Sequence, residues 1–175
     1  YTLNLLSQDD VLGYVDKISM RDQEHVLLLS RLPQRRLVEH LDLDKVEAYW
    51  VTTQDVTGSI QPSLDQIGDL VTKRVENHAG IAVVEGIEWL ISLHGFSEVL
   101  KLVMNLKDSL HRKPWSIILV VAEDIFDEIQ HAKWHREAPS WEVPKKIEFS
   151  ELDEEEALTD LSDLEEDQVP EDRSN

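Results

Sequence analysis

Short apolar runs alternate with helical patterns through residues 1–137 of the chain. Continuous apolar or β-branched runs are typical of strands covered on both faces, and they occur at 2–6, 26–29, 49–53, 81–84 and 117–121. Apolar positions three or four residues apart predict amphipathic helices, and they occur at 11–18, 37–41, 63–77, 96–111 and 125–136. Strands and helices that alternate in this way indicate βαβ crossovers. We therefore predict an α/β fold whose mostly parallel sheet is covered by helices on both faces.

The residues that follow the predicted strands are the first candidates for a site, because ligands of parallel sheets bind beyond the carboxyl ends of the strands. Arg31 follows one strand, and Arg35 and Arg36 come soon after it, which makes 31–36 the densest basic cluster of the chain. Guanidinium groups suit carboxylates and phosphates. The cluster is therefore either an anion-binding patch, for acids of a partner or of this same chain, or a solvated basic turn.

The segment 83–110 carries a resemblance to a known family. Its motifs are an acid and a glycine at a strand end, an aromatic-Leu-Ile step, a helix that begins with Gly-Phe, and a basic-acidic pair. They stand here as Glu85-Gly86, Trp89-Leu90-Ile91, Gly95-Phe96 and Lys107-Asp108. With Arg31 and Pro33 upstream, these motifs resemble the archaeal domain of unknown function 835 over about residues 1–137. The resemblance implies a RecA-like core, of the kind attached to archaeal sensor and receiver proteins, and it implies no activity.

A RecA-like ATPase needs a glycine-rich loop after its first strand, where backbone N–H groups and a lysine hold the phosphates. The sequence contains no G-x-x-x-x-G-K-[ST] motif, and Asp9 and Asp10 stand at the corresponding place. Glu85 and Glu88 end a strand where an active relative has a metal-binding acid, although the family more often has Asp at the first position. We expect one glutamate to cap the following turn and the other to face solvent. We also expect no catalytic residue, no cofactor and no metal.

Two pairs of side chains near the end of this region have alternative interpretations. His131 and His135 are one turn apart on the last predicted helix, as two metal ligands would be. No third ligand is evident, so we expect an ordinary exposed helix face. Trp134 and Trp141 are either exposed anchors for a partner or residues that close the core over that helix.

Charge is distributed unevenly along the chain. Residues 147–175 hold thirteen of the 36 acids and one of the 17 Lys plus Arg, so their net charge is −12 and that of residues 1–146 is −7. A segment with so much like charge cannot form a core of its own, but Leu158, Leu161 and Leu164 recur at roughly helical spacing. We predict an α/β domain at 1–146 and an acidic tail at 147–175, disordered alone, that folds against a partner or a basic surface.

The remaining composition narrows the function class. The chain has no cysteine, which excludes disulfides and thiolate chemistry and fits a cytoplasmic location. Its negative charge disfavours direct binding to nucleic acid, and no apolar run reaches the length of a membrane span. The first residue is Tyr1, and we expect the sequence to begin inside a longer protein.

Together these patterns predict a non-catalytic scaffold or signalling module that binds another protein through the strand-end rim, the tail, or both. The candidate partner-binding residues are Arg31, Arg35, Arg36, Glu85, Trp134, Trp141, Leu158, Leu161 and Leu164. Two alternatives stay open. In one, the tail mimics phosphates and binds a DNA-binding protein. In the other, the chain is a nucleotide-binding subunit whose phosphate-binding elements come from another chain.

Overall fold

The computed structural model describes residues 1–4, 8–20 and 24–140, all of which belong to one unit of the chain, 1–141. Trp141 and the three leucines of the predicted tail lie outside the described residues, and so does the predicted domain boundary at 146. The account of the fold therefore concerns the α/β domain.

The centre of the domain is one six-stranded sheet in the order β1-β6-β5-β2-β3-β4. Its strands are β1 (Thr2–Asn4), β2 (His25–Ser30), β3 (Val46–Val51), β4 (Ser59–Ile60), β5 (Gly80–Val84) and β6 (Trp115–Val121). Every neighbouring pair is parallel, and in the central register Leu28 lies opposite Ala48 on one side and Val83 on the other. The predicted α/β fold with its parallel sheet is confirmed.

In the described part of the chain, six α-helices and one 3-10 turn join or follow the strands. They are α1 (Gln8–Ser19), α2 (Gln34–Leu37), α3 (Leu64–Asn77), α4 (Ile87–His94), α5 (Phe96–Ser109), η1 (Glu123–Ile125) and α6 (Glu128–Glu137). The helix predicted at 125–136 begins later, because Asp127 is extended and its side chain accepts a hydrogen bond from the Gln130 N–H in a capping box. The turn η1 that precedes it places Glu123 directly after β6.

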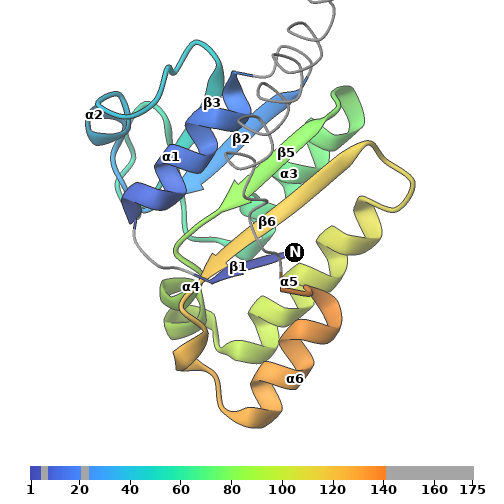
Figure 1. The fold of residues 1–175 in the computed structure, drawn as a ribbon. Helices are drawn as coiled ribbons and strands as arrows, with labels where there is room; N and C mark the ends of the chain where they lie inside the picture. The colour runs from blue at the N-terminus through green and yellow to red at the C-terminus, as the bar shows by residue number, and fades with distance from the viewer. Residues whose placement is uncertain (5–7, 21–23, 141–175) are drawn as a thin grey trace, which may run out of the picture. The chain divides into compact units, whose positions relative to one another are not determined.

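The helices cover both faces of the sheet, as Figure 1 shows. On one face α1 and α2 bury Val15 and Leu37 against Leu28. On the other face α3, α4, α5 and α6 cover the alternate residues of the same strands, such as Leu27. Successive residues of β2 therefore point into different cores, which explains why its sequence is apolar throughout.

The connections diverge at the centre of the sheet. From β2 the chain passes through α2 to β3 on one side, whereas from β5 it passes through α4 and α5 to β6 on the other side. Such a reversal opens a crevice beyond the carboxyl ends of the two central strands, which is where α/β sheets usually bind their ligands. In this fold that crevice lies between the residues that follow β2 and those that follow β5.

Among the described residues, no helix combines the length and the apolar character needed to cross a membrane.

Candidate functional site

The exposed side chain of Arg31 lies at the crevice position between β2 and β5, against the residues that follow β5. Gly86, which follows β5 and precedes the first residue of α4, has a φ of 83°, in the left-handed region that favours glycine. A Cβ atom at this position would lie 2.7 Å from Cγ of Arg31. The stem of Arg31 therefore passes directly over the backbone at which α4 begins.

The head of Arg31 is held by two neighbouring elements. Its guanidinium carbon lies 3.6 Å from the centroid of the Trp89 ring on α4, and its Nη1 donates a hydrogen bond of 2.6 Å to the carbonyl of Val51 at the end of β3. The backbone carbonyl of Arg31 in turn accepts a hydrogen bond from Trp50 Nε1. Arg31 thus bridges three strand-end segments instead of offering its charge to an anion.

The other two arginines of the cluster differ from Arg31. Arg35 and Arg36 lie on α2 and are exposed, and their side chains have no hydrogen bond or ion pair to any other described residue. All three arginines are exposed, but the head of Arg31 is bonded to neighbouring segments, whereas the side chains of Arg35 and Arg36 have no such contact.

Apolar side chains are exposed beside these two arginines. Val38 is 59% exposed, and Val56 is 46% exposed. A hollow of about 370 Å³ is lined by Arg35, Trp50 and Val56, among other residues. We call the set Arg35, Arg36, Val38 and Val56 the α2 patch. Guanidinium groups next to exposed apolar groups are suited to a protein segment that carries both acids and apolar residues.

The two glutamates after β5 differ in their surroundings. Glu88 accepts a hydrogen bond from the Ala122 N–H and so binds the backbone where β6 ends. Glu85 is buried, with 8% of its surface exposed, so the expectation of a solvated acid is wrong for this residue. Its small exposed area also makes it a poor contact for a partner, which corrects its place among the candidate residues.

Trp134 belongs to the core, and its interpretation as a surface anchor is wrong. Its side chain is fully buried beside Phe126 and Phe96. Its Nε1 donates to the hydroxyl of Thr2, which donates in turn to the carbonyl of Ala138. The indole therefore joins α6 to β1, and the alternative in which it closes the core over the last helix is the one observed.

A third polar residue joins the histidine pair of α6. The rings of His131 and His135 lie 4.3 Å apart between centroids, and both face Glu123 of η1. Nε2 of His131 is 3.7 Å from one carboxylate oxygen, and Nε2 of His135 is 3.2 Å from the other. The expectation that no third ligand accompanies the histidines is therefore wrong. The sequence could have indicated this ligand, because Glu123 lies two residues after the end of β6, on the segment that leads into α6.

A second polar network, which the sequence did not predict, lies near the amino ends of the strands. The carboxylate of Glu47 accepts hydrogen bonds from Arg74 Nε at 2.7 Å and from the Tyr49 hydroxyl at 2.8 Å, and His25 Nε2 is 2.7 Å from it. Burial opposes ionisation of Glu47, but these hydrogen bonds outweigh it and lower its pKa to about 2. Burial and the bond to Glu47 raise the pKa of Tyr49. The network ties α3 to β2 and β3, which gives it a structural role.

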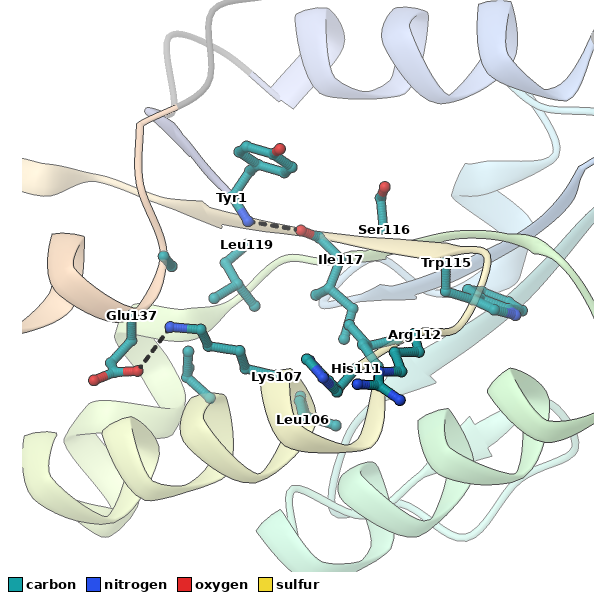
Figure 2. Close-up of a pocket in the computed structure, with 13 residues that line it drawn as sticks. Tyr1, Leu106, Lys107, His111, Arg112, Trp115, Ser116, Ile117, Leu119 and Glu137 are labelled. Atoms are coloured by element: carbon teal, nitrogen blue, oxygen red, sulfur yellow. Dashed lines mark hydrogen bonds and ion pairs between the residues drawn. The ribbon is translucent and has the colours of Figure 1, made fainter.

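The pocket in Figure 2 lies away from the crevice, against the amino-terminal half of β6. It has a volume of about 390 Å³ and an apolar floor that includes Leu106 and Ile117. Lys107 at its edge is paired with Glu137, with 3.3 Å between Nζ and Oε2. None of the candidate partner-binding residues lines it.

Comparison with models of protein families finds a match over residues 6–137, to a family described as Protein of unknown function (DUF835). A search of curated proteins finds no match.

Proposed function

Because the chain belongs to the DUF835 family of proteins of unknown function, whose description gives no activity, we propose a function from its geometry: a non-catalytic, regulatory module that binds another protein. The match confirms the family resemblance of segment 83–110 and extends over most of the chain. The activity, the partner and the location of the protein are proposals.

The observation that carries this proposal is the position of Arg31. The crevice between β2 and β5 is where an α/β domain would place a nucleotide or a substrate. Here the stem of Arg31 lies over Gly86, and its head is committed to Trp89 and Val51. A ligand in the crevice would have to displace a cation–π contact and a hydrogen bond to a backbone carbonyl, both of which stabilise the domain. This supports an interaction module over a nucleotide-binding subunit.

The α2 patch is the surface that we assign to the partner. Arg35 and Arg36 need no rearrangement to bind carboxylates, because neither side chain has a hydrogen bond or an ion pair to another described residue. Arginine is enriched among the residues that dominate binding energies at protein interfaces. The neighbouring Val38 and Val56 are exposed, and burial of their apolar surface by a partner would favour binding. The occupant is a segment of another protein that presents acids and apolar side chains together.

The acidic residues 147–175 form the second proposed surface. Leu158, Leu161 and Leu164 lie outside the described residues, so their assignment depends on the sequence pattern alone. A negative segment with spaced leucines would bind a basic, apolar groove on a partner, and its binding would weaken as salt increases.

Capture of proteins from a lysate of the source organism tests both surfaces. The immobilised baits are the whole chain, the variant Arg35→Glu with Arg36→Glu, and a chain that ends at Lys146. The matched control is Lys45→Glu with Lys73→Glu, which makes the same change in charge at two exposed lysines outside the α2 patch. Bound proteins are quantified by mass spectrometry at low and high salt.

The proposal predicts at least one protein that the whole chain and the lysine control capture equally. Its affinity for the double arginine variant should be about thirtyfold lower, since two interfacial interactions of about 1 kcal/mol each would be lost. A protein lost from the chain that ends at Lys146 would identify the tail as the contact. Equal recovery on every bait would refute both surfaces.

A further inference from the structure

We propose that Glu123, His131 and His135 form a binding site for a divalent transition-metal ion of the Zn²⁺ class. The proposal is independent of the α2 patch and goes beyond the function proposed above. It concerns the segment from η1 to α6, at the carboxyl end of β6.

The backbone brings the three side chains together from two elements. Residues four apart on an α-helix lie on one face, which places His131 and His135 side by side on α6. The capping box of Asp127 and Gln130 fixes the start of that helix. Glu123 enters from the 3-10 turn that follows β6, and Glu88 binds the N–H of the residue before it. The three ligands are therefore held by two anchored segments.

The distances fit a metal centre. Two ligand atoms bonded at about 2.05 Å to a tetrahedral Zn²⁺ lie about 3.3 Å apart. The carboxylate oxygens of Glu123 lie 3.2 Å from Nε2 of His135 and 3.7 Å from Nε2 of His131, and the three ligand atoms all lie within 4.8 Å of one another. Small rotations of the exposed His131 ring would bring the set to tetrahedral spacing.

Burial supports the same conclusion. His135 and Glu123 each expose 18% of their side chains, and Nε2 of His135 is shielded from solvent without a hydrogen bond to another described group. A metal ion between this nitrogen and the carboxylate would give the shielded nitrogen a partner.

The donor set selects the class of metal. Two imidazole nitrogens and one carboxylate oxygen suit Zn²⁺, Co²⁺, Ni²⁺ or Cu²⁺, whereas Mg²⁺ and Ca²⁺ prefer oxygen ligands alone. His131 is half exposed, so one side of the cluster is open to solvent. A fourth position would take water or a side chain of another protein. An ion bound here would crosslink η1 to α6.

Metal titration of the full chain tests this site. Chain stripped with a chelator is titrated with ZnCl₂ against a chromophoric competitor, and with CoCl₂ while the d–d absorption is recorded. Parallel samples are the variants Glu123→Gln, His131→Ala and His135→Ala. The controls are Asp124→Asn and His111→Ala, which alter an exposed acid and an exposed histidine outside the cluster. MgCl₂ serves as the oxygen-preferring comparison.

The site predicts one Zn²⁺ per chain, a Co²⁺ spectrum of four- or five-coordinate type, and a rise in Tm on metal addition that MgCl₂ does not produce. Each of the three ligand variants should weaken Zn²⁺ binding at least tenfold, while both controls bind as the wild type does. Circular dichroism checks the fold of each variant, and the half-exposed His131 provides a test even if His135→Ala unfolds. Absence of saturable Zn²⁺ binding would overturn the proposal. So would binding that persists unchanged in His131→Ala, because it would then come from acids elsewhere in the chain.

Discussion

The guanidinium carbon of Arg31 lies 3.6 Å from the centroid of the Trp89 ring, and this contact joins the end of β2 to the first turn of α4. It explains why a basic residue at a strand end, in the usual position of a ligand contact, is instead part of the scaffold. The same side chain donates a hydrogen bond to the carbonyl of Val51, so Arg31 links the ends of β2 and β3 and the start of α4.

Substitution of Arg31 should therefore reduce stability. Arg31→Ala removes a cation–π contact worth about 0.5–1 kcal/mol and a hydrogen bond worth about 1 kcal/mol, so we expect a loss of about 1–2 kcal/mol in the free energy of unfolding. Urea denaturation at neutral pH measures it. Arg35→Ala is the matched control and should change stability by less than about 0.5 kcal/mol. Equal losses in the free energy of unfolding would show that the contacts of Arg31 contribute no more to stability than those of Arg35.

Gly86 should be intolerant of a side chain, for two separable reasons. At a φ of 83° an alanine costs about 1–2 kcal/mol, and its Cβ would lie 2.7 Å from Arg31 Cγ. The second cost disappears in an Arg31→Ala background, so the double variant should lose less stability than the sum of the single ones. Gly13→Ala is the control, since a Cβ there meets nothing within 4 Å and should stabilise α1 by about 0.5–1 kcal/mol. Additive losses at Gly86 and Arg31 would argue against the contact.

The Glu47 network makes stability depend on pH in the acid range. The pKa of Glu47 is about 2 in the folded chain and 4.5 in the unfolded one. The contribution of Glu47 to the free energy of unfolding is therefore present above about pH 4.5 and is lost as the pH falls towards 2. Because the side chain is about one-fifth exposed, we expect Glu47→Gln to cost about 1–2 kcal/mol at pH 7. The difference between wild type and variant should shrink between pH 5 and pH 2 in urea denaturation. Glu76→Gln, an exposed change on α3, should show no such pH dependence.

Trp134 should behave as a core residue. Trp134→Phe keeps most of the apolar volume but removes the N–H that is bonded to Thr2, for an expected loss of about 1–3 kcal/mol. It should also reduce the part of the fluorescence that acrylamide does not quench, to which the buried Trp115 contributes as well. Trp50→Phe, at a half-buried position, should cost less and leave that protected emission intact. Full quenching of the wild type would place Trp134 at the surface.

The sequence predicted the layered fold because the residues of its central strands point into two cores and so are apolar throughout. It missed α4, whose segment 87–94 was interpreted only as a family motif, and β4, which has two residues and no periodic pattern. The helix at 125–136 was placed too early because Ile125 fits the apolar spacing, whereas the cap at Asp127 determines the true start.

The candidate site was less predictable, because it depends on contacts between distant segments. Nothing local distinguishes Arg31 from Arg35; the difference arises from Trp89, which is 58 positions further along the chain. Glu123 joins His131 and His135 only because η1 turns back towards α6. Trp134 had two open interpretations, and its contact with Thr2, at the opposite end of the domain, decides between them.

The central claim, that Arg31 closes the crevice to small ligands, is tested most directly by thermal unfolding of the full chain with and without Mg·ATP and Mg·GTP, with MgCl₂ alone as the control. The account predicts that neither nucleotide changes Tm beyond the magnesium control. A ligand bound only by the folded chain would instead stabilise it by about 2.7 kcal/mol at a hundred times its Kd. A saturable, nucleotide-specific rise in Tm would contradict the account and would indicate a nucleotide-binding subunit.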